Sequence, residues 1–152
     1  MAVLKDVHYR SLLFSAIVAA YFYQFTGNYF DGFMGWFTSQ YSTLFNQQWG
    51  PYIAHTFNSI FFAWVYAKYG MKYIPGPNII KGTIFGVVLG VVVIVTMMIV
   101  GAGGGTMAKM MQGMPTSMMI GFFINHAVWG GFVGALYNDE HCLNKDGKKC
   151  CC

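Results

Sequence analysis

The chain has 152 residues, of which 56% are hydrophobic and 9% are charged, and its net charge is +4 at pH 7. Soluble domains carry about 25% charged residues, so this composition favours a membrane protein. The apolar runs are continuous rather than alternating, which argues against a membrane barrel, and the scattered basic residues argue against a nucleic-acid partner.

Four apolar stretches are long enough to cross about 30 Å of hydrocarbon as α-helices that rise about 1.5 Å per residue. They lie near residues 11–30, 51–69, 79–100 and 115–137. Pro51 and Pro115 open two of them, where a missing N–H costs nothing in the first helical turn. No small-residue cleavage site follows the first stretch, so we expect it to remain as an anchor. Residues 1–137 are therefore predicted to form one all-α domain of four transmembrane helices.

Basic residues predict the orientation, because cytoplasmic loops are enriched in Lys and Arg. Eight of the nine fall on one side of the predicted spans: Lys5, Arg10, Lys68, Lys72, Lys81, Lys145, Lys148 and Lys149. Only Lys109 falls on the other side. We therefore expect a multi-pass protein of the inner (cytoplasmic) membrane of the cell, with both termini in the cytoplasm.

The two outer segments are predicted to contain short helices at the membrane interface. Residues 31–50 are rich in aromatic side chains, including Trp36 and Trp49, and hold no basic residue. Such a composition is typical of a segment that lies at the headgroup level. The other outer segment begins with a glycine run after residue 100 and then becomes rich in methionine.

Methionines in this second outer segment repeat at the spacing of one helical face: Met107, Met110, Met111, Met114 and Met118. Soft thioethers on an outward-facing segment are ligands for Cu(I). The alternative is a flexible apolar face that lies on lipid or on a partner subunit. We favour the alternative, because Pro115 interrupts the stripe and the loop contains no cysteine or histidine to complete a copper site.

Glycines recur every four residues in the last two predicted helices. They are Gly82, Gly86 and Gly90 in the third helix, and Gly130 and Gly134 in the fourth. Such stripes let helix backbones approach closely in lipid, where no hydrophobic drive brings helices together. Packing inside the chain and a seam between copies in a homo-oligomer use the same physics, and we favour the former.

Two histidines, His55 and His126, lie within the predicted spans. Counted from the two prolines, their depths differ by about 10 Å, which argues against one haem clamped between them. An ionisable group as deep as His126 faces the bundle interior or a water-filled cavity. We favour a neutral His126 that is hydrogen-bonded across helices; the candidate partners are Asn125, Asn58, Thr56 and Ser59. The alternatives are a single axial ligand to haem or chlorophyll, a metal ligand and a proton-transfer group.

Residues 138–152 form a tail that contains all four cysteines: Cys142, Cys150, Cys151 and Cys152. Cytoplasmic thiols stay reduced, so no disulfide framework is expected. With His141 the thiols are candidate metal ligands, and beside Lys148 and Lys149 they are candidates for acylation. Adjacent cysteines are poorly spaced for a compact tetrahedral site, and we expect a flexible tail.

Three segments between about Tyr52 and Tyr137 carry a family resemblance: HTFNSIFFAWVYAKYG, PNIIKGTIFGVVLG and HAVWGGFVGALY. They resemble a family of small four-helix bacterial and archaeal membrane proteins without an assigned function. The matching positions are His55, Phe62, Tyr66, Lys81, Gly82, Gly86, His126, Gly130, Gly134 and Tyr137. The resemblance implies four helices and singles out the two histidines, and it implies no activity. The aromatic outer segment and the cysteine-rich tail lie outside the pattern.

No predicted span holds an acid–base pair, and the chain has neither a nucleophile motif nor a phosphate-binding loop between a strand and a helix. We therefore expect a non-catalytic protein. The leading hypothesis is an accessory subunit of a larger respiratory or photosynthetic membrane complex, such as an electron-transfer complex or an oxidase. The alternatives are a protein that binds haem, chlorophyll or copper through His126 and His55, and a small oligomeric transporter or channel.

Overall fold

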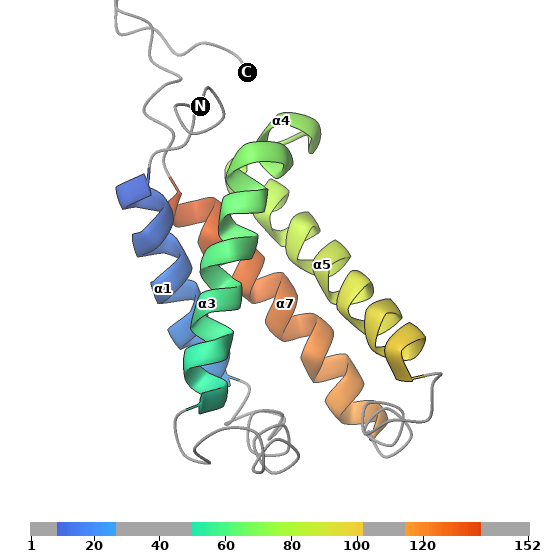
Figure 1. Cartoon of the computed structure of the whole chain (residues 1–152). Helices are drawn as coiled ribbons and strands as arrows, with labels where there is room; N and C mark the ends of the chain where they lie inside the picture. Colours follow the sequence, from blue (N-terminus) through green and yellow to red (C-terminus); the bar gives the residue numbers. More distant parts are fainter. Residues whose placement is uncertain (1–8, 27–49, 102–114, 138–152) are drawn as a thin grey trace, which may run out of the picture.

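The computed structural model of the chain describes residues 9–26, 50–101 and 115–137 (Figure 1). These residues form four main helices and contain no strand: α1 (Tyr9–Thr26), α3 (Gly50–Val65), α5 (Asn78–Gly101) and α7 (Thr116–Leu136). The predicted all-helical fold with four helices is confirmed. α5 and α7 match the predicted ranges 79–100 and 115–137 to within one residue at each end.

The helical run that starts with α3 continues through a π-helical turn. The π turn η3 (Tyr66–Gly70) and the short α4 (Met71–Tyr73) follow α3 without a break. The fully buried Tyr66 donates its hydroxyl hydrogen bond to the carbonyl of Asn78, the first residue of α5, at 3.1 Å. Between α4 and α5, Gly76 has φ = 109°, a left-handed conformation that favours glycine. The chain therefore reverses in a tight turn that Tyr66 fastens to the next helix.

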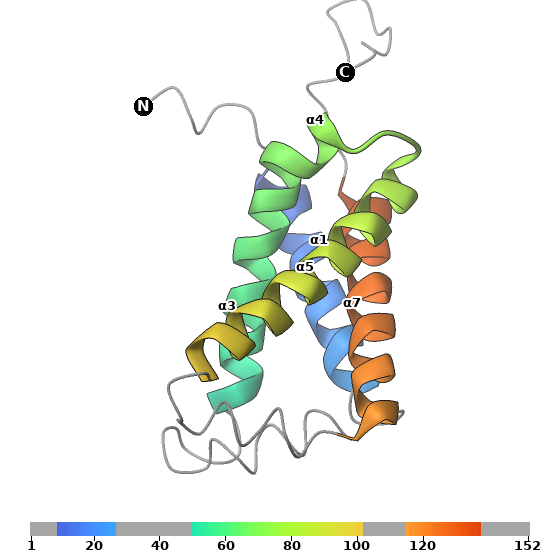
Figure 2. The same cartoon turned by 90° about the vertical axis from the view of Figure 1, so that its right-hand side faces the viewer.

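The helices pack in the spatial order α3, α1, α7, α5. α7 contacts both α1 and α5, and α1 contacts α3 in turn (Figures 1 and 2). α5 meets the α3 run mainly near the turn, through η3 and α4, and then slants away from α3 (Figure 1). Away from the turn, α3 and α5 therefore do not pack against each other.

The surface of the described residues is strongly apolar. Two helices are long and apolar enough to cross a membrane: α5, over Asn78–Ile99, and α7. Large apolar side chains are exposed on all four helices, for example Phe14, Phe57, Val88 and Ile124. Extended apolar surface of this kind marks contact with a membrane or with another protein.

Glycines form the contact between α5 and α7, where backbone meets backbone. A Cβ built on Gly82 would overlap the carbonyl oxygen of Gly130, and one on Gly86 would overlap the carbonyl oxygen of His126. Gly130 and Gly134 meet the backbone of α5 in the same way. Four of the five glycines predicted to pack helices therefore lie at a contact inside this chain, where no larger side chain fits.

Candidate functional site

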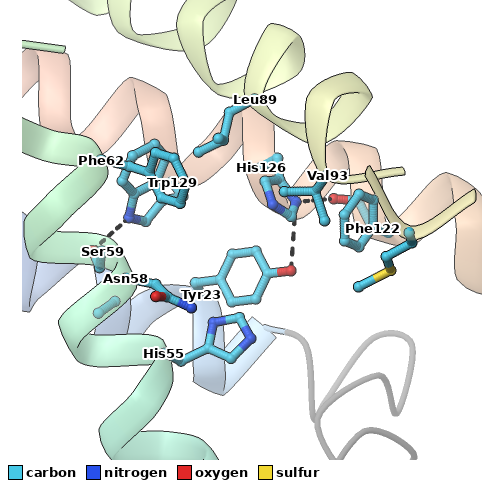
Figure 3. Close-up of a pocket in the computed structure, with 12 residues that line it drawn as sticks. Tyr23, His55, Asn58, Ser59, Phe62, Leu89, Val93, Phe122, His126 and Trp129 are labelled. Atoms are coloured by element: carbon cyan, nitrogen blue, oxygen red, sulfur yellow. Dashed lines mark hydrogen bonds between the residues drawn. The ribbon is translucent and has the colours of Figure 1, made fainter. Parts of the chain in front are cut away.

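A partly open pocket of about 140 Å³ lies where the four helices come together (Figure 3). Aromatic and aliphatic side chains form most of its wall. Its lining is Ala20 and Tyr23 from α1, His55, Asn58, Ser59 and Phe62 from α3, Leu89, Val93 and Met97 from α5, and Phe122, His126 and Trp129 from α7. Both histidines predicted from the sequence thus line one pocket.

The pocket opens between α3 and α5. Its lining residues from α1 and α7 are buried, whereas exposed or half-buried lining residues come from the other two helices. Asn58 on α3 is exposed, and Val93 and Met97 on α5 are half-buried. This is the side on which α5 slants away from α3, so the slant of α5 creates the entrance.

His126 is held in one tautomer by the backbone of its own helix. Its Nδ1 lies 2.9 Å from the carbonyl oxygen of Phe122, one turn earlier. A carbonyl oxygen only accepts hydrogen bonds, so Nδ1 carries the proton and donates it. Nε2 is then the unprotonated nitrogen, a hydrogen-bond acceptor and a ligating atom. At metal sites, too, histidine donates one ring N–H to a carbonyl or carboxylate, and this bond orients the other nitrogen.

Tyr23 lies between the two imidazoles (Figure 3). Its ring stacks on His55 at a centroid distance of 5.3 Å and meets His126 edge-on at 5.2 Å. Its hydroxyl oxygen is 3.5 Å from Nδ1 of His126. The sequence places the two histidines at different depths, yet both contact the same side chain, because the Tyr23 ring lies between them. Its phenol ring occupies the space that a haem shared by both imidazoles would need.

Ser59 lines the pocket from α3 and bonds to two other helices. Its hydroxyl donates to the carbonyl of Ala16 at 2.7 Å and accepts from Nε1 of Trp129 at 2.7 Å. One buried side chain on α3 therefore links α1 and α7. These bonds position the Trp129 indole as a wall of the pocket (Figure 3).

Two of the candidate partners predicted for His126, Ser59 and Thr56, form other hydrogen bonds. Ser59 bonds to Ala16 and Trp129, and Thr56 donates to the carbonyl of Tyr52. His126 is bonded instead to Phe122 and, across helices, to Tyr23. Tyr23 gave no signal in the sequence beyond its place in α1 on the same face as a run of small residues: Ser15, Ala16, Ala19 and Ala20.

The remaining residues singled out in the sequence lie away from the pocket or outside the described residues. Gly90 faces the ring of Phe123, whose nearest atom would lie 3.1 Å from an added Cβ. Met118 is half-buried on α7 and packs against the core. Outside the described residues lie both outer segments, the tail and these candidate ligands: Met107, Met110, Met111, Met114, His141, Cys142, Cys150, Cys151 and Cys152.

The pocket offers an acceptor nitrogen, Nε2 of His126, within largely aromatic walls. Within the described ranges, no three His, Cys, Asp or Glu side chains form a group that could hold a metal ion. Comparison of the chain with protein-family models, with curated proteins and with solved structures finds no match.

Proposed function

We propose that this chain is a non-catalytic integral membrane protein and an accessory subunit of a larger membrane complex. The observation that carries the proposal is the packing of α5. The glycine side of α5 contacts α7, whereas its opposite side is exposed. That opposite side, which we call the α5 outer face, consists of Ile84, Val88, Val91 and Val95.

Valine and isoleucine suit the α5 outer face to contact with another helix. Their branched Cβ restricts χ1 in a helix, so little rotamer freedom is lost when a neighbour packs on them. Helix association in lipid depends on close packing rather than on release of water. A rigid apolar face on a helix that packs in this chain mainly against α7 supports a site for a helix of a partner subunit.

The charges at one end of the bundle support membrane insertion with that end in the cytoplasm. All basic residues of the described ranges lie there: Arg10, Lys68, Lys72 and Lys81. Lys68 lies 5.1 Å from the ring centroid of Trp64, and Lys72 lies 5.2 Å from that of Tyr73. Paired aromatic and basic side chains are typical of the membrane interface. We therefore propose that all four helices span, as an even number of spans returns both termini to this side.

Thiol labelling tests the orientation, because all four cysteines lie in residues 142–152. A membrane-impermeant maleimide should label the protein in opened cells and leave it unlabelled in intact cells. A variant with the four cysteines changed to Ser and with Ser39→Cys provides the control, since residue 39 belongs to the predicted outer segment. Labelling of the natural cysteines in intact cells would contradict the orientation.

Extraction in a mild detergent tests the subunit proposal. At native expression the protein should migrate with a discrete mass well above that of a small homo-oligomer. Val91→Trp, on the α5 outer face, should release the small form, whereas Phe14→Trp on the exposed face of α1 should leave the large form intact. Migration of the unaltered protein only as a monomer or homo-oligomer, or equal behaviour of the two variants, would refute the proposal.

A further inference from the structure

We propose that the pocket binds one aromatic ring that carries a hydroxyl group, and that this hydroxyl donates a hydrogen bond to Nε2 of His126 (Figure 3). The ligand class comprises simple phenols and the reduced head groups of membrane quinols. The inference concerns the pocket and is independent of the α5 outer face, so either proposal stands if the other fails.

The need for a donor follows from the state of His126. The side chain is 8% exposed and lines the pocket. Its Nδ1–H is directed to the Phe122 carbonyl, and in the described part of the chain no hydrogen bond reaches Nε2. A buried acceptor without a partner is costly. A ligand that fits this place therefore presents a donor to Nε2.

The need for a single ring follows from the size and the wall of the pocket. Its volume of about 140 Å³ is close to that of the apolar cavity of about 150 Å³ that holds benzene. Tyr23, Phe122 and Trp129 supply ring faces and edges, which pair favourably with another aromatic ring. The pocket thus favours one six-membered ring over a haem or a chlorophyll.

The entrance adds room for an apolar substituent. Val93 and Met97 form the α5 side of the entrance, which faces outward between two helices with apolar surfaces. A chain attached to the bound ring leaves through this gap into the surroundings of the bundle. The same hydroxylated ring therefore has two sources, a small phenol from water or a quinol from the bilayer.

The fixed tautomer of His126 selects the oxidation state of the ligand. A hydroquinone has two hydroxyl donors, whereas the oxidised quinone has only carbonyl acceptors, which cannot bond to an unprotonated Nε2. Moving the proton to Nε2 would break the bond from Nδ1 to the Phe122 carbonyl and set two acceptors against each other. The hydrogen bond at Nε2 should therefore favour hydroquinone over benzoquinone.

Binding ratios test the hydrogen bond. Dissociation constants for phenol and for toluene, which lacks the hydroxyl, are measured on the purified full chain. The toluene-to-phenol ratio should fall about 10-fold in His126→Leu, as one hydrogen bond predicts. Partition of each probe into detergent cancels when the ratios of two variants are compared. Thr83→Val, an altered hydroxyl on α5 outside the pocket, should leave the ratio unchanged. An unchanged ratio in a folded His126→Leu would overturn the proposal.

Nitrogen NMR of the ¹⁵N-histidine-labelled protein decides the matter without a variant. Phenol and hydroquinone should shift the Nε2 resonance of His126 saturably to lower frequency, while toluene and benzoquinone should not. A resonance that none of the four probes moves would mean that Nε2 binds water alone and would overturn the proposal.

Decyl-hydroquinone in phosphatidylcholine vesicles separates the two sources. If it binds and Met97→Trp weakens its binding more than that of phenol, the ligand is a membrane quinol. If only phenol binds, the ligand is a small phenol.

Discussion

The glycine contact between α5 and α7 makes a sharp prediction for the matched variants Gly86→Ala and Gly90→Ala. Both add one methyl group to the same face of α5, one turn apart. At position 86 the new Cβ would overlap the His126 carbonyl oxygen and would lie 3.2 Å from the Cα of Gly130. At position 90 its nearest neighbour is the Phe123 ring, at 3.1 Å. The first variant meets backbone, and the second meets a side chain that can turn.

The two variants should differ by roughly 2 kcal/mol in the free energy of unfolding. Alanine gains about 0.5–1 kcal/mol over glycine in a helix interior at either site. At position 86 the helices must move apart by on the order of 1 Å, which forfeits about a quarter to a half of the dispersion energy of the nearby contacts. Overpacking of this kind costs about 1–3 kcal/mol. Because the overlap at position 86 is with backbone, the cost lies at the upper end of that range, about 3 kcal/mol, so Gly86→Ala should be destabilised by about 2 kcal/mol after the helix gain. Gly90→Ala should stay within about 0.5 kcal/mol of the parent protein, since the gain there offsets the crowding of a side chain that can turn.

Reversible unfolding in mixed micelles, followed by circular dichroism against the mole fraction of SDS, measures this difference. Gly86→Ala should unfold at a clearly lower fraction of SDS than either the parent protein or Gly90→Ala. Equal midpoints for the two variants would show that α5 and α7 do not meet through their backbones at Gly86, and the packing argument would be wrong.

Two further variants probe the hydrogen bonds around the pocket. Ser59→Ala removes the partner of the Trp129 indole N–H, so it should lower the free energy of unfolding by about 1–3 kcal/mol. The control Thr83→Ala removes an exposed hydroxyl and should change the free energy of unfolding by less than about 0.5 kcal/mol. Equal losses in the two variants would contradict the role of Ser59. Tyr23→Phe keeps the ring and removes a weak contact of 3.5 Å, so the ¹⁵N spectrum of His126 should still show the proton on Nδ1; a proton on Nε2 would show that Tyr23, rather than the Phe122 carbonyl, sets the tautomer.

The helices and the glycine spacing could be predicted because both are local patterns. Long apolar runs, the second of them opened by Pro115, give the ranges of α5 and α7 to within a residue. The period of four residues gives one face of a helix whatever its partner is. A pattern of this kind does not name the partner, and the choice of α7 came from the structure.

The composition of the pocket could not be predicted, because it depends on rotation and tilt of whole helices. Tyr21 and Tyr23 are the same residue two positions apart, yet Tyr21 is 72% exposed and Tyr23 is 4% exposed. Only the small residues that share a face with Tyr23 indicated which side of α1 is buried. The sequence allows Ser59 several hydrogen-bond partners. Its actual partners, the Ala16 carbonyl and the Trp129 indole, depend on how α1, α3 and α7 pack together.

The contact of Gly82 and Gly86 with α7 also has a thermal consequence. Burial of apolar surface from water weakens on cooling, because it carries a large change in heat capacity. Two glycine backbones in contact withdraw little hydrocarbon from water and are held by dispersion and close fit. The association of α5 with α7 should therefore vary little with temperature, and the pair should hold together in a cold membrane as firmly as in a warm one.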